Sequence, residues 1–150
     1  MPESIVLKRG ISGYHRIDDE LPVIDEKQFT SSCYALANLV NGRFVSIDTT
    51  LLGKNFYFTH IKIGEEDIYV LLNSIYPMIS FARKVDYFDV EFIDSKKYTQ
   101  YFQTNYLVLT LQELNASLLD VEHQLDQFEL NQIDYFNSKR VGDVIYNFWD

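Results

Sequence analysis

The fold class follows from residues 55–72, which read NFYFTHIKIGEEDIYVLL. Apolar and polar side chains alternate over residues 55–63, a pattern typical of a strand with one buried face. Gly64 and the three acidic residues after it form a turn signal, and a second β-rich run follows at residues 68–72. The stretch therefore predicts an antiparallel hairpin in the middle of the chain.

Further β-rich runs lie on both sides of this hairpin. Residues 4–8 predict an edge strand, and residues 44–47 predict a strand just before the hairpin. Residues 78–83 and 85–93 follow it, and residues 106–109 form a last short candidate. Because an antiparallel sheet is stable with one face solvated, we expect a meander-like antiparallel sheet of about 4–6 strands.

Two helices are predicted outside the C-terminal third. The first covers residues 26–40, where apolar residues recur on one helical face. Asp25 is its expected N-cap, and Asn41-Gly42 is its expected stop, because both residues tolerate positive φ. A shorter helix is predicted over residues 95–103, with Asp94 as its cap.

The C-terminal third carries the most regular apolar pattern in the chain. Thr110 and Glu113 have the spacing of a capping box. Six apolar residues then recur at spacings of three and four, namely Leu111, Leu114, Leu118, Val121, Leu125 and Phe128. The pattern predicts one long C-terminal helix that extends to about Phe136. We expect the tail at 141–150, VGDVIYNFWD, to pack back on the body of the domain.

Together these elements predict a single α+β domain spanning residues 1–150, with the sheet packed against an N-terminal helix and a long C-terminal helix. The leucine stripe suits the inner face of a helix lying on its own sheet. It also suits a coiled-coil seam, so both a monomer and a homodimer stay open.

The charge balance limits the classes of partner. The chain has 22 acidic and 13 basic residues, a formal net charge of -9. Binding to nucleic acid needs clustered basic side chains, so we expect no nucleic-acid partner. An anionic membrane surface is disfavoured for the same reason. No apolar run approaches the length of a membrane span, and no secretory signal pattern is present, which predicts a cytoplasmic protein.

Residues with reactive side chains are few. Cys33 is the only cysteine, and the histidines His15, His60 and His123 lack metal-site spacing. No phosphate-binding, dinucleotide-binding or nucleophile-elbow motif occurs. We therefore expect a noncatalytic protein without cofactor or metal. The alternative is a small cytosolic enzyme or small-ligand-binding protein that uses Cys33 or a histidine.

Acidic residues gather in two places. Residues 111–150 carry eight acidic and two basic residues. If the leucine stripe is buried, four of these acids point outward from the predicted helix: Asp120, Glu122, Asp126 and Glu129. Asp18, Asp19 and Glu20 form a second candidate patch. Such charge either serves solubility or forms a docking face for a basic protein, with Tyr or Phe side chains as anchors. A phage-type DNA mimic is a further alternative.

A small, acidic, cytosolic α+β protein without a catalytic motif resembles the immunity proteins that bacteria make against their own polymorphic toxins. The ending VGDVIYNFWD is also similar to the terminal segment of small uncharacterised bacterial proteins. The resemblance implies a stoichiometric inhibitor that masks a basic toxin. It assigns no role to any individual residue.

Overall fold

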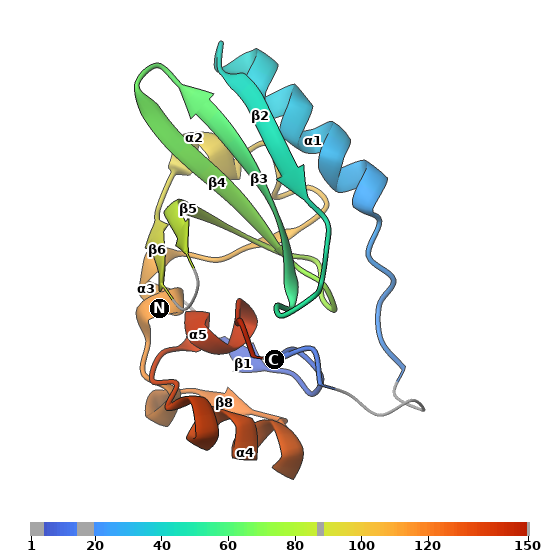
Figure 1. Cartoon of the computed structure of the whole chain (residues 1–150), viewed down its shortest axis with the longest axis vertical. Coiled ribbons are helices and arrows are strands. Elements are labelled where there is room, and N and C mark those ends of the chain that lie inside the picture. The colour runs from blue at the N-terminus through green and yellow to red at the C-terminus, as the bar shows by residue number, and fades with distance from the viewer. Residues whose placement is uncertain (1–4, 15–19, 87–88, 150) are drawn as a thin grey trace.

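The computed structural model describes residues 5–14, 20–86 and 89–149. The fold is mixed α+β, with a mostly antiparallel sheet that has α1 along one side and the terminal segments at its lower end (Figure 1). The strands are β1 (Val6–Leu7), β2 (Arg43–Asp48), β3 (Phe56–Ile63), β4 (Glu66–Asn73), β5 (Met78–Asp86), β6 (Asp89–Ile93), β7 (Leu107–Val108) and β8 (Glu122–His123). The helices are α1 (Glu26–Leu39), α2 (Lys96–Thr99), α3 (Leu111–Asn115), the 3₁₀ helix η1 (Leu118–Asp120), α4 (Gln127–Phe136) and α5 (Val141–Ile145).

The main sheet has six strands, and five of them follow one another in sequence order from β2 to β6. The predicted hairpin is confirmed, because β3 and β4 pair along their full length from Phe56↔Asn73 to Ile63↔Glu66. Gly64 turns the chain with a φ of 63°. The last strand, β7, lies parallel to β5 and shares one edge of β5 with β6. The antiparallel meander is therefore confirmed for β2–β6 and wrong for β7.

One face of the sheet is covered by α1. The predicted helix boundaries hold closely, and the Asp25 carboxylate accepts a hydrogen bond from the N–H of Gln28 as an N-cap. The inner side of α1 buries Phe29, Cys33 and Leu36 against apolar residues of β3, β4 and β5. We call this cluster the α1-side core.

The opposite face is covered in part, at the end away from the β3–β4 turn, by the terminal segments of the chain (Figure 1). Residues 5–14 and 109–149 pack there on apolar side chains such as Phe56, Leu71 and Phe92. The tail does pack back as predicted, since Trp149 is only 6% exposed. Gly142 is required in it, because an added Cβ would lie 2.5 Å from the Phe92 ring. We call this cluster the terminal-side core, and the segment 109–149 the C-terminal layer.

Three buried asparagines join the sheet to both terminal segments. Asn55, just before β3, donates to the carbonyls of Ile11 and Ile145, each at 3.0 Å. Asn73, at the end of β4, donates to the same two carbonyls at 2.9 and 2.8 Å. Asn147 donates from its backbone N–H to the Asn55 side-chain oxygen at 2.7 Å. These amides satisfy backbone groups that no helix or strand pairs.

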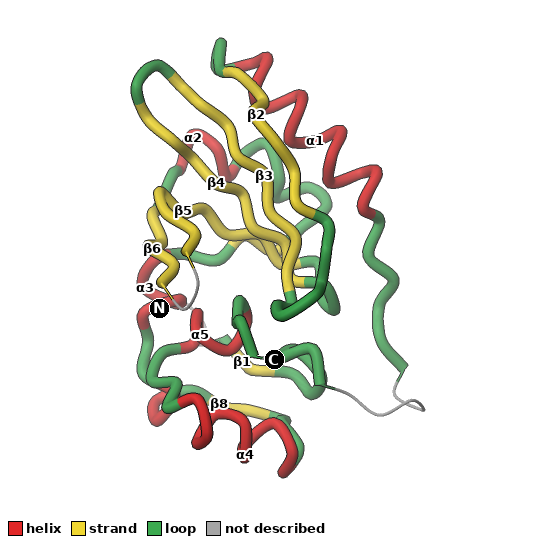
Figure 2. Tube along the Cα trace, viewed as in Figure 1, coloured by secondary structure: helices red, strands yellow, loops and turns green. Residues whose placement is uncertain are grey.

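The predicted long C-terminal helix is wrong. The segment forms short helices separated by extended residues, as Figure 2 shows. The chain leaves α3 at Ala116, and β8 pairs in parallel with β1 at the N-terminal end. The apolar stripe therefore reaches the terminal-side core from several elements, with Leu114 and Leu125 buried and Phe128 exposed. A continuous helix could not supply the backbone partners that β1 takes from β8.

The signal for this break is present in the sequence. Asp126-Gln-Phe-Glu129 has the same capping-box spacing as Thr110-Leu-Gln-Glu113, and both boxes form in the structure. A capping box starts a helix, so the second one marks a new helix within the predicted one.

The predicted cap of the shorter helix is also wrong. Ser95 caps α2 by accepting a hydrogen bond from the N–H of Tyr98. Asp94 instead accepts from the N–H of Leu111, 17 residues further along the chain, at 2.6 Å. Asp94 thus fixes the start of α3 rather than that of α2. Within the described ranges, no helix is long and apolar enough to cross a membrane.

Candidate functional site

The predicted acidic docking face is only partly assembled on the C-terminal layer. Asp120 at the end of η1 and Glu122 in β8 are both exposed to solvent. The N–H of Leu118 donates to the carbonyl of Lys139 at 2.9 Å, which holds η1 beside the segment that follows α4. Asp120 therefore lies on an element held beside the segment that follows α4, and Glu122 lies two residues further along the chain.

The expectation that Glu129 points outward is wrong. Its side chain is fully buried and accepts hydrogen bonds from the N–H groups of Gly10 and Ser12, at 3.0 and 3.3 Å, and from the Ser12 hydroxyl. These donors lie in a turn that has no strand partner for them, so a carboxylate on α4 takes that place. Asp126 is half-buried and caps α4 through the N–H of Glu129 at 2.9 Å. Both carboxylates hold the layer together, and Glu129 has no exposed surface for a partner.

The second predicted acidic patch is described at one position only. Glu20 is exposed on the segment that leads to α1. Asp18 and Asp19 lie outside the described residues.

Sequence reasoning missed the apolar part of the surface. Leu119, between Leu118 and Asp120, is 94% exposed, and Tyr135 on α4 is 80% exposed. Asp134 is exposed beside Tyr135. The predicted long helix gave no role to Leu119 or Tyr135, because neither belongs to the apolar stripe. We define the acidic surface as two exposed groups of residues, Leu119, Asp120 and Glu122 on η1 and β8, and Asp134 and Tyr135 on α4, with the exposed Lys139 on the segment held beside η1.

Cys33 is part of the α1-side core. Its side chain has no solvent exposure, and its thiol lies 3.4 Å from the Thr59 hydroxyl. Burial raises the pKa of Cys33 to about 12, so the thiol is protonated at neutral pH. A nucleophilic thiolate is not available in this arrangement.

The described histidines have structural partners. His60 on β3 lies 2.8 Å from Asp67 on β4 and stacks on Tyr69. The hydrogen bond from His60 holds the pKa of Asp67 below its usual value. His123 is exposed, and its Nδ1 accepts from the N–H of Leu125. His15 lies outside the described residues. In the described part of the chain, no three His, Cys, Asp or Glu residues gather as a metal site.

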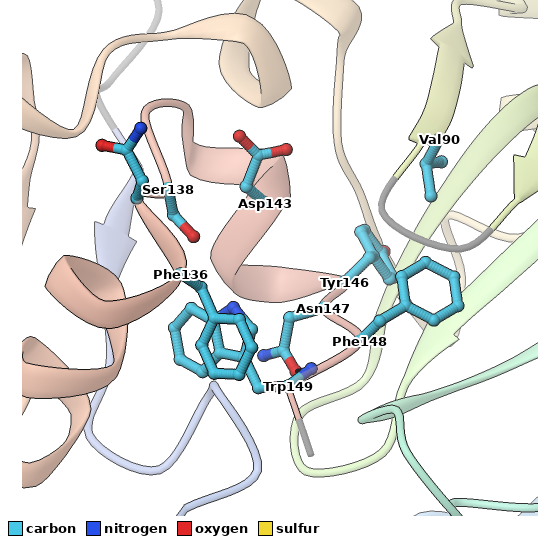
Figure 3. A pocket seen from close by; sticks show the side chains of 9 residues that line it. Val90, Phe136, Ser138, Asp143, Tyr146, Asn147, Phe148 and Trp149 are labelled. Atoms are coloured by element: carbon cyan, nitrogen blue, oxygen red, sulfur yellow. Dashed lines mark hydrogen bonds between the residues drawn. The ribbon is translucent and has the colours of Figure 1, made fainter.

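One pocket of about 250 Å³ opens beside the tail (Figure 3). The rings of Phe136 and Trp149 stack along it, with centroids 5.7 Å apart. Asp143 is the charged residue of the lining, and its carboxylate is already held by the Arg140 guanidinium at 2.8 Å. A larger pocket of about 380 Å³ lies beside α2 and β7, with Phe81, Val108 and Leu109 among its lining residues. Neither lining contains a histidine or a cysteine.

Comparison with known proteins adds no further assignment. No protein-family model matches this chain, and no match was found among curated proteins or solved structures.

Proposed function

We propose that this protein is a noncatalytic protein-interaction module, an immunity-type inhibitor that masks a basic toxin with its acidic surface. The observation that carries the proposal is the exposure of Leu119 beside Asp120 and Glu122. Leu119 is almost fully solvated, and two exposed carboxylates, Asp120 and Glu122, follow it in the chain. Leu119 is a suitable anchor for a partner that the charges attract.

The distribution of charge supports the same proposal. Residues 111–150 carry most of the net charge, with eight acidic and two basic residues. A field of one sign on one layer accelerates the encounter with a basic protein, whereas exposed apolar side chains slow its dissociation. Asp120, Glu122 and Asp134 would supply the attraction. Leu119 and Tyr135 would supply the contact area.

The experiment measures binding to the basic partner, captured on the tagged full chain from lysate of cells that express it. Two double variants are compared, Asp120→Asn/Glu122→Gln on the acidic surface and Glu65→Gln/Glu66→Gln on the β3–β4 turn. Both remove two exposed charges. We expect the first to slow association by about tenfold and to flatten its salt dependence, and the second to have little effect.

The apolar anchors are tested with Leu119→Ala and Tyr135→Ala. Each is expected to raise the dissociation rate, with a loss of at least about 1 kcal/mol in binding free energy. The melting temperature should stay unchanged, because both side chains are exposed. Equal binding by both double variants and by both alanine variants would show that the acidic surface serves solubility only.

A further inference from the structure

A second surface lies at the other end of the molecule, along the outer edge of β2. The sheet order ends at β2, and in the described residues this strand pairs with β3 alone. The outer edge of β2 therefore carries backbone N–H and C=O groups without a strand partner. An unpaired edge is a template for pairing with another strand unless the fold covers it.

Exposed apolar side chains surround this edge. Leu39 at the end of α1 is 60% exposed, and Leu52 in the loop after β2 is 91% exposed. Tyr34, Val45 and Leu51 are also among the exposed large apolar residues. Half of the exposed large apolar residues in the described chain thus lie on α1, on β2 or in the loop after it. Apolar residues gathered on one surface mark an interaction site.

We propose that a second copy of this chain binds here, by antiparallel pairing of the two β2 strands about a two-fold axis. The sequence Arg43-Phe-Val-Ser-Ile-Asp48 is complementary to itself in this arrangement. With the axis at the centre of the strand, Arg43 lies opposite Asp48 of the second copy, and Phe44 lies opposite Ile47. The axis generates each of these pairs twice, once on either side of it, as an isologous interface requires.

The same axis also brings the apolar residues together. Leu39 precedes β2, whereas Leu51 and Leu52 follow it, so antiparallel pairing sets Leu39 of each copy beside the loop of the other. An axis perpendicular to the sheet leaves both α1 helices on the same face. Tyr34 stacks on Phe44 near the edge, with ring centroids 3.9 Å apart. In the dimer, Tyr34 of one copy would face Tyr34 of the other.

Two features act against this association, the register shift in β2 and the net negative charge. Neither removes the complementary pairs. The strand has a register shift between Phe44 and Ser46, which interrupts regular pairing at Val45. The complementary residues lie at the two ends of β2, on either side of that shift. The net charge of -9 causes repulsion, but β2 itself has one acidic and one basic residue. The acidic C-terminal layer lies at the far end of the molecule from β2 (Figure 1).

The test is sedimentation velocity on the purified full chain over a range of concentration. We expect the wild type to become dimeric as its concentration rises to about 100 µM. Val45→Lys and Leu52→Lys are each expected to weaken the dimer by at least about tenfold, because both place a charge in the interface. The matched control is Leu119→Lys, which adds the same charge at an exposed leucine far from β2. It should leave the dimer intact.

The two-fold geometry is tested by charge exchange. Arg43→Asp and Asp48→Arg should each weaken self-association, since each places like charges opposite each other. Mixing the two variants should restore a dimer that contains one copy of each. Asp48 also accepts a hydrogen bond from Thr50 and pairs with Lys54, so circular dichroism must first show that Asp48→Arg is folded. If that variant does not fold, Val45→Lys and Leu52→Lys decide alone.

A monomeric wild type up to about 100 µM would overturn the proposal. A dimer that neither Val45→Lys nor Leu52→Lys weakens would overturn it as well. The result is independent of the proposed function, because Asp120→Asn/Glu122→Gln should leave the dimer unchanged. Conversely, Val45→Lys should leave binding of the basic partner unchanged.

Discussion

The two cores of this protein are built in different ways. The α1-side core joins a regular helix to the middle of the sheet through apolar packing around Phe29, Cys33 and Leu36. The terminal-side core joins short elements through buried side-chain amides and a buried carboxylate, alongside its apolar residues. Regular elements satisfy their own backbone groups, whereas short elements need side chains to do so. The terminal-side core is therefore the part of this fold that depends on single polar residues.

The largest effect is expected from Asn55→Ala. The Asn55 side chain donates to the carbonyls of Ile11 and Ile145 and accepts from the N–H of Asn147. Removing it leaves these buried groups without that partner, at a cost of about 3 kcal/mol in the free energy of unfolding. Urea denaturation followed by circular dichroism measures this loss.

The matched control is Asn131→Ala, an exposed asparagine on α4. Its removal should change the free energy of unfolding by less than about 0.5 kcal/mol. If both substitutions cost the same, the buried amides do not carry the terminal-side core, and the contrast between the two cores is wrong.

A smaller effect is expected from Glu129→Gln. The carboxylate accepts from two N–H groups and one hydroxyl of the Gly10–Ser12 turn, and an amide can offer only one oxygen to them. We expect a loss of about 2 kcal/mol in the free energy of unfolding, because hydrogen bonds to a charged group are the stronger ones. Hydrogen exchange should show faster opening of residues 10–12 than of α1.

Asp134→Asn is the control, since it removes an exposed carboxylate from the same helix. It should leave both the free energy of unfolding and the exchange rates unchanged. Equal exchange at residues 10–12 in Glu129→Gln and in the wild type would contradict the role given to this carboxylate.

Local sequence patterns determine the elements around the α1-side core, but not the short elements of the C-terminal layer. The β3–β4 hairpin and α1 were predicted well, because local alternation, a glycine turn and an N-cap determine them. The spacing of the leucines predicted burial of Leu114 and Leu125 correctly. It did not predict the element that carries them, because spacings of three and four also arise when separate short elements face one core.

In the candidate site, some features are evident in the sequence and others depend on contacts between distant residues. The acidic character of the C-terminal layer is evident in the sequence, and Asp120 and Glu122 are exposed as predicted. Burial of Glu129 depends on a turn more than a hundred residues away, whose donors no local pattern connects to α4. Exposure of Leu119 depends on η1, which forms because the chain leaves α3 at Ala116.

The smallest effect is expected in the α1-side core, from Cys33→Ala. Loss of the buried sulfur should cost about 1 kcal/mol at pH 8, since one small group and a weak hydrogen bond to Thr59 disappear. The cost depends on pH with a definite sign. Burial raises the pKa of Cys33 from 9.0 to about 12, so between these values the unfolded thiol loses a proton that the folded thiol keeps. The stability contribution of Cys33 is therefore full below pH 9 and decreases above it.

The difference in free energy of unfolding between the wild type and Cys33→Ala should decrease by about 1.4 kcal/mol per pH unit above pH 9. Comparing the two proteins cancels the part of the Tyr106 contribution that comes from burial, whereas the part that comes from the Cys33 charge is counted with Cys33. Ser32→Ala, the neighbouring position on α1, should show no such dependence. Labelling of Cys33 by a thiol reagent at pH 8 should be slow and should accelerate with urea, because the native thiol is protonated and inaccessible. Fast labelling that urea does not accelerate would instead indicate an accessible thiolate, and would restore Cys33 as a candidate nucleophile.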